Sequence, residues 1–147
     1  MIKEVEDELN VLQLLHTSID QLVEGLTDED WAQKPGESFN NIASIIDHVM
    51  LVEQKFLSVI AGLPSEIDTQ EPFHANSWDV PRIKAKWEKI LDDAKLLLSK
   101  VSEDDLTDPG LTLRVGDLNK RQLLTYMIAH TAHHRGQLPL VKRLLAK

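Results

Sequence analysis

Apolar side chains recur along this chain at spacings of three and four residues, the period of an amphipathic helix. The pattern predicts four long helices, at residues 2–25, 41–61, 79–101 and 119–145. The steps Pro35-Gly36 and Pro109-Gly110 interrupt two of the connections between them. We therefore expect an all-α fold, a four-helix bundle, in which residues 1–147 form a single domain.

The segments between the predicted helices differ in character. Residues 27–30 can cap a short helical turn that carries Trp31. Residues 65–79 are polar and lack a period, so we expect a long surface connection, and loops of this length are more often functional than average. Residues 111–115 alternate like a strand, but five residues cannot make a sheet alone, so we expect an extended lead-in to the last helix.

Composition narrows the classes of function. The chain has 16 basic and 24 acidic residues and a formal charge of −8, which repels phosphate backbones and anionic lipids. We therefore expect neither nucleic acid nor a membrane as partner. Because there is no cysteine, a tightly bound metal needs histidine or carboxylate ligands. The sequence has neither a signal-peptide pattern nor a membrane-spanning apolar run, which favours a cytoplasmic location.

On the second and the last predicted helices, three histidines occupy positions where the helical pattern expects an aliphatic core residue. His130 and His134 lie one turn apart on the last predicted helix, so both imidazoles can reach one ion. His48 lies on the inner seam of the second predicted helix. A single core histidine is usually satisfied by a hydrogen bond to a neighbour, but three on helix seams favour a metal site.

Histidine nitrogens suit Zn, Ni, Fe or Co rather than Mg or Ca. Three protein ligands leave coordination positions open for water or substrate, as in catalytic zinc sites. The sequence therefore predicts an open metal site formed by His48, His130 and His134. A metal at such a site lowers the pKa of a bound water or thiol and so generates a nucleophile.

The remaining histidines have two interpretations each. His16 falls on the inner seam of the first predicted helix. It is either a proton carrier in the same cavity or a core histidine whose hydrogen bonds are satisfied by a neighbour. His133 is interpreted as a structural residue or as support for a ligand histidine. His74 lies in the long connection, where it either closes over the pocket or is solvated.

Other polar residues and one glycine lie close to the predicted ligands in the sequence. Asp47 and Glu53 flank His48 and could orient an imidazole, but the helical wheel favours neither, so both are left outside the site. Arg135 is expected to pair with an acidic residue or with helix-end carbonyls. Gly136 indicates the close approach of another helix, since glycine inside a helix costs about 1 kcal/mol relative to alanine.

The segment His130–Leu138 (HTAHHRGQL), together with Ile45–Val49 (IIDHV) and an acidic residue shortly after it, resembles the DinB-like superfamily of metal-dependent enzymes. The resemblance spans nearly the whole chain. It implies an up-down-down-up four-helix bundle, frequently a homodimer, with His48, His130 and His134 as ligands. The implied metal is zinc or nickel, with iron, cobalt and manganese as alternatives.

The resemblance also implies a class of reaction. Characterised members of the family include thiol transferases that use bacillithiol or mycothiol, and a mycothiol-dependent isomerase. We therefore expect transfer of a low-molecular-weight thiol to a small electrophilic molecule, with metal-dependent hydrolysis as the second hypothesis. Two other hypotheses stay open: a non-catalytic, stress-associated module in which the metal ties two helices together, and a helical protein that binds no metal.

Overall fold

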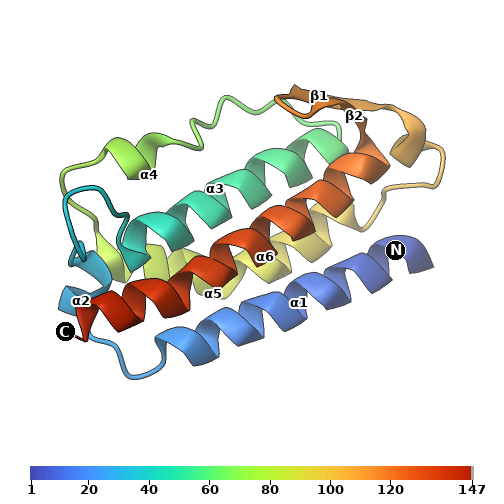
Figure 1. Ribbon diagram of the computed structural model, residues 1–147. Helices are drawn as coiled ribbons and strands as arrows, with labels where there is room; N and C mark the ends of the chain where they lie inside the picture. Colours follow the sequence, from blue (N-terminus) through green and yellow to red (C-terminus); the bar gives the residue numbers. More distant parts are fainter. Residues whose placement is uncertain (147) are drawn as a thin grey trace.

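The computed structural model describes residues 1–146, in which four long helices form a bundle (Figure 1). These helices confirm the four predicted from the apolar pattern, and they are α1 (Lys3–Val23), α3 (Ile42–Ile60), α5 (Val80–Leu98) and α6 (Lys120–Leu145). The shorter elements are α2 (Asp28–Ala32), α4 (Glu71–His74), the 3-10 turn η1 (Asp105–Thr107), and strands β1 (Pro109–Leu113) and β2 (Gly116–Asn119).

The helices follow the up-down-down-up order. Figure 1 shows α1 and α6 running in one direction and α3 and α5 in the other. Because α3 and α5 are parallel, the segment between them, residues 61–79, has to return along the length of the bundle. This segment contains α4, which contacts α3. The predicted long connection therefore becomes a cover over one side of α3.

Side chains at the helix starts explain where three of the long helices begin. The Asn41 side chain accepts a hydrogen bond from the Ser44 amide at 2.7 Å, and its amide nitrogen donates to the Ala32 carbonyl at the end of α2. Asp79 caps α5. Asn119 caps α6 in a reciprocal arrangement with Gln122. Such caps are each worth about 1 kcal/mol.

Two groups of buried apolar side chains fill the bundle. One includes Leu12, Leu57, Leu98, Leu106 and Leu123, and the other includes Ile19, Ile46, Met50, Ile90 and Leu138. Residues 41–50, the start of α3 with its cap, are all buried. Because α3 packs against α2, α4, α5 and α6, a polar side chain on this stretch needs a partner inside the protein.

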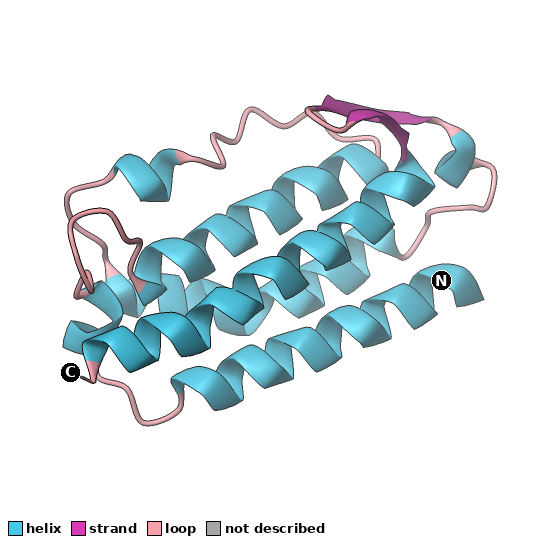
Figure 2. Cartoon of the chain, viewed as in Figure 1, coloured by secondary structure: helices cyan, strands magenta, loops and turns pink. Residues whose placement is uncertain are grey.

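The expectation of a lone extended segment before α6 is wrong. Strands β1 and β2 form an antiparallel hairpin, in which Leu113 pairs with Gly116 (Figure 2). Gly116 has φ 131°, a conformation that favours glycine, and a Cβ on Gly110 would lie 2.8 Å from the Leu118 carbonyl oxygen. The prediction missed β2 because Gly-Asp-Leu-Asn lacks the β-branched and aromatic residues that mark strands.

Within residues 1–146 no helix combines the length and apolar character needed to cross a bilayer.

Candidate metal centre

Three histidine side chains from two helices meet between α3 and α6. The Nε2 atom of His48 on α3 lies 3.0 Å from Nε2 of His130 on α6. Nε2 of His134, one turn further along α6, lies 3.1 Å from the same His130 atom. Within residues 1–146, these three form the one group of His, Asp or Glu side chains whose ligand atoms all lie within 4.8 Å of one another.

The returning segment between α3 and α5 covers two of the three imidazoles, those of His48 and His134. His48 is 3% exposed, and its ring lies 4.5 Å from that of Phe73. The Phe73 ring also lies 6.3 Å from that of His134. His74, which the sequence placed as a possible cover, is exposed, so its neighbour Phe73 occupies that position.

Two of the imidazoles have a fixed orientation. His48 Nδ1 donates to the Thr69 carbonyl oxygen, and His134 Nδ1 donates to Gln137 Oε1 at 2.7 Å. Both acceptors are oxygens without a proton, so each Nδ1 carries the ring hydrogen. A neutral imidazole protonated at Nδ1 has its lone pair on Nε2. The lone pairs of His48 and His134 therefore both point toward His130.

The donor set fits a divalent transition metal. His130 Nε2 can donate its proton to only one of the two lone pairs that face it. The other lone pair therefore faces a nitrogen with no proton between the two atoms. The other ring nitrogen of His130, Nδ1, is buried without a hydrogen-bond partner among the described residues. Nitrogens about 2.0–2.1 Å from one ion lie roughly 2.8–3.4 Å apart in octahedral or tetrahedral geometry. The spacings from His130 to His48 and to His134, 3.0 and 3.1 Å, fall within that range.

Burial keeps the three imidazoles neutral. Desolvation, followed by the neighbouring imidazoles His134 and His48, lowers the pKa of His130 from 6.5 to about 3. Desolvation lowers the pKa of His134 to about 4, against the opposing effect of the Gln137 hydrogen bond. Desolvation also lowers the pKa of His48. Near pH 7 all three rings are in the unprotonated form that binds metals.

A hollow of about 290 Å³ opens beside the cluster, lined by Tyr126, Ala129, His130 and His133. His133 is exposed and packs edge-on against His134, with ring centroids 5.0 Å apart. The close helix approach predicted for Gly136 is wrong within this chain, because a Cβ there would meet nothing within 4 Å. The outer face of this part of α6 is therefore open.

His16 lies outside the three-histidine group. Its Nε2 is 2.9 and 3.0 Å from the two carboxylate oxygens of Glu53, which is fully buried. The Thr131 hydroxyl donates to the same carboxylate at 2.8 Å. The His16 ring stacks on Trp87 with centroids 4.0 Å apart. This environment is that of a satisfied core histidine, and the part of His16 in proton transfer stays a prediction.

Two other polar residues that flank the ligands, Asp47 and Arg135, lie outside the three-histidine group. Asp47 is buried at a small pocket that Arg82 also lines, and it makes no hydrogen bond to an imidazole within the described residues. Desolvation raises the pKa of the Asp47 carboxyl. Arg135 Nε donates to Ser18 Oγ on α1 at 2.9 Å. Arg135 therefore has a structural contact, but the predicted partner, an acidic residue or a helix-end carbonyl, is wrong, because the partner is a serine hydroxyl.

The residues that orient and cover the ligands were not predicted from the sequence. Gln137 had a usable signal, because it stands three residues after His134 on the same helix face. Thr69 and Phe73 had none, since both act through a connection without a period. Glu53 was not assigned to the site, because the helical wheel gave no reason to direct it toward His48. Its partner His16 lies on another helix, and a helical wheel does not show how two helices are placed relative to each other.

Three solved structures share the fold of this chain. A DinB-like protein from Bacillus cereus is 22% identical, with a TM-score of 0.73 over 96% of this chain and 92% of its own. The DinB-like protein YjoA from Bacillus subtilis is 20% identical, with a TM-score of 0.67 over the same shares. YfiT from Bacillus subtilis, described as a probable metal-dependent hydrolase with an unusual four-helix bundle topology, is 13% identical, with a TM-score of 0.74 over 99% and 90%.

At these identities the structural likeness establishes the fold and nothing finer. No curated protein sequence matches the chain. The family model of the DinB superfamily matches residues 12–138, which contain His48, His130 and His134. The chain therefore belongs to the DinB superfamily.

Proposed function

We propose that this protein is a metal-dependent enzyme in which His48, His130 and His134 hold one divalent transition metal, zinc or nickel first. One observation carries the proposal: Nε2 of His130 lies 3.0 Å from that of His48 and 3.1 Å from that of His134, and the lone pairs of both are directed at it. No arrangement of protons satisfies all three nitrogens, whereas a cation does. The description of YfiT as a probable metal-dependent hydrolase agrees with this assignment.

A transition metal held by three histidines is a Lewis acid that lowers the pKa of a water or thiol at its open positions. The protein supplies the rest of the site. Thr69 and Gln137 fix the ring orientation of His48 and His134. Phe73 shields these rings from solvent on the side of the returning segment.

The hollow beside His130 is where we place the substrate. Its volume of about 290 Å³ suits a small molecule, and it opens to solvent past the exposed His133. Tyr126 contributes a phenol to its wall and His133 an imidazole. Both can donate a hydrogen bond to a substrate oxygen, and His133 can also transfer a proton between the hollow and solvent.

Hydrolysis of a small molecule is the reaction that we favour, since water needs no further binding site. Transfer of a low-molecular-weight thiol, the first hypothesis from the sequence, is the second candidate. The chain has no cysteine, so the thiol in such a reaction has to come from outside the protein.

The test is a screen of the zinc-loaded and the nickel-loaded protein against small esters, amides and electrophiles, each with and without bacillithiol or glutathione. Turnover that requires metal alone assigns hydrolysis, and turnover that requires metal and thiol assigns transfer. His130→Ala is expected to abolish either activity. His133→Ala is expected to keep the metal content of wild type. Equal turnover by wild type and His130→Ala would contradict the proposal.

A further inference from the structure

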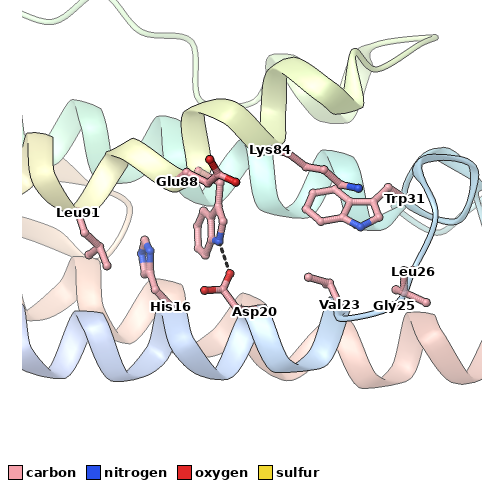
Figure 3. Close-up of a pocket in the computed structure, with 10 residues that line it drawn as sticks. His16, Asp20, Val23, Gly25, Leu26, Trp31, Lys84, Glu88 and Leu91 are labelled. Atoms are coloured by element: carbon pink, nitrogen blue, oxygen red, sulfur yellow. Dashed lines mark hydrogen bonds between the residues drawn. The ribbon is translucent and has the colours of Figure 1, made fainter.

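A second cavity, of about 520 Å³, lies between α1 and α5 (Figure 3). It arises because α1 packs mainly on α6 and makes few contacts with α5. Its volume is in the range of small-molecule binding sites, about 300–1,000 Å³. None of its lining residues belongs to the three-histidine centre, and they are His16, Asp20, Val23, Gly25, Leu26, Trp31, Lys84, Trp87, Glu88 and Leu91.

Two tryptophans form the inner wall of this cavity. Trp31 is 3% exposed and Trp87 is 8% exposed. The ring of His16 stacks on Trp87 at an interplanar angle of 8° and supports it. Lys84 Nζ lies 5.0 Å from the centroid of a Trp31 ring, a position in which a cation is attracted by the π-system. The cavity therefore already presents an indole face to a positive charge.

The charges at the cavity are acidic in sum. Lys84 is compensated by Asp28, whose Oδ1 lies 2.6 Å from Nζ. Asp20 Oδ1 accepts a hydrogen bond from the neutral indole Nε1 of Trp87 at 2.7 Å, which leaves the carboxylate charge uncompensated. Glu88 makes no ion pair within the described residues.

Figure 3 shows the Asp20 side chain extending from α1 and the Glu88 side chain extending from α5, so the two carboxylates come from the two helices that border the cavity. His16 adds no net positive charge, because its imidazole lies against the Glu53 carboxylate. The indole Nε1 of Trp31 is buried without an acceptor among residues 1–146, but it is a hydrogen-bond donor and takes no part in attracting a cation. The cavity thus combines aromatic faces with two uncompensated carboxylates.

We propose that this cavity is a second binding site, which takes a small organic cation consisting of a protonated amine on a compact apolar body. The ammonium group is attracted by the carboxylates of Asp20 and Glu88, and the apolar body packs on Trp31 and Trp87. An anion is disfavoured because it would meet the same two carboxylates. The inference is independent of the metal centre and of the reaction proposed there.

Indole NMR signals provide the test, because the chain has three tryptophans and the third serves as an internal control. Trp78 lines a different pocket, and its Nε1 donates to the Pro72 carbonyl oxygen at 2.9 Å. Benzylammonium chloride is titrated into the ¹⁵N-labelled, zinc-loaded protein at constant ionic strength. The Nε1–H signals of Trp31 and Trp87 are expected to shift and saturate, while that of Trp78 stays in place.

Variants then assign the charges. Glu88→Gln is expected to weaken binding about twofold to fivefold, because Glu88 is exposed and exposed charge contacts are worth at most about 1 kcal/mol. Asp20→Asn is expected to weaken binding by at least as much, since it also loses the charge next to Trp87. Asp93→Asn removes an exposed carboxylate of α5 outside the cavity and leaves the affinity unchanged. Thermal unfolding of each variant shows whether it is folded, and Glu88, which makes no hydrogen bond within the described residues, carries the test if Asp20→Asn is not.

The proposal would be overturned by shifts that do not saturate, by equal shifts of all three indoles, or by an affinity for benzoate that matches that for benzylammonium. An equal loss of affinity in Glu88→Gln and Asp93→Asn would also overturn it. That result would show general attraction of cations to a chain of charge −8.

Discussion

His48 and His130 place their Nε2 atoms 3.0 Å apart although 82 positions separate them in the sequence. They meet because α3 and α6 are antiparallel neighbours in the bundle, an arrangement that the long return from α3 to α5 makes possible. The stretch of α3 around His48 is buried, so this imidazole depends on the contacts that the protein provides. The relationship makes the metal centre a property of the topology and not of a local motif.

Gln137 is predicted to tune metal affinity without being a ligand. Gln137→Leu removes the acceptor that fixes the His134 ring, and loss of such a partner typically costs about 10–100-fold in affinity. Competition with a chromophoric chelator measures the change, while the stoichiometry stays at one ion per chain. Gln21→Leu, an exposed position on α1, is the control. An unchanged affinity in Gln137→Leu would show that the hydrogen bond has no part in the site.

The metal-free protein is predicted to lose stability as the pH falls. Burial lowers the pKa of His130 to about 3 and that of His134 to about 4, below the ordinary value of 6.5. As the pH falls from about 6.5 toward 4, the unfolded chain therefore binds protons that the folded chain does not, and the free energy of unfolding decreases.

Urea unfolding of chelator-treated protein between pH 7.5 and 4.5 measures this effect. Carboxylates elsewhere also respond to acid, so the informative quantity is the difference between wild type and His130→Leu. We expect the variant to have the shallower decline. A steeper decline in the variant than in wild type would mean that His130 is not held neutral by burial.

Glu53 is predicted to be the most costly polar residue to remove from the core. Glu53→Ala leaves the His16 ring nitrogen and the Thr131 hydroxyl buried without their partner. Breaking a buried pair in this way costs roughly 3–5 kcal/mol. Thr131→Val removes one hydrogen bond and costs about 1 kcal/mol. Chemical denaturation checks the order, and a Glu53→Ala protein as stable as Thr131→Val would contradict it.

Phe73 is predicted to slow the exchange of metal. Its ring covers His48 and His134, so Phe73→Ala exposes that side of the centre to solvent. Metal transfer to excess chelator, followed by stopped flow, is expected to be faster in Phe73→Ala. His74→Ala, the exposed next residue, is expected to match wild type. Identical rates of metal transfer in all three proteins would show that Phe73 does not shield the metal centre.

The long helices could be predicted because each has an apolar stripe and a distinct start or stop. Gly25, with φ 79° just beyond α1, and Asn119 at the start of α6 are examples of such local signals. The hairpin could not be predicted in the same way. Strand β2 is stabilised by pairing with β1 and by packing of Leu118 on the core, and a window of four residues contains neither interaction. The order of the helices came from the family resemblance.

The candidate ligands were accessible to sequence reasoning for a physical reason: an imidazole on an apolar seam is anomalous, and His130 and His134 share one helix. What lies between helices was not accessible. The contact of His16 with Glu53 depends on how α1 is rotated against α3, which no single-helix wheel gives. The same holds for the cavity between α1 and α5, whose wall combines Trp31 with Trp87.

The most direct test of the central claim is the metal content of the purified protein and of four single variants, by elemental analysis after dialysis. We expect one zinc or nickel ion per chain in wild type and in His133→Ala, which changes an exposed histidine next to His134. His48→Ala, His130→Ala and His134→Ala are each expected to fall well below one ion per chain while remaining folded. Equal metal content in wild type and these three variants would contradict the assignment.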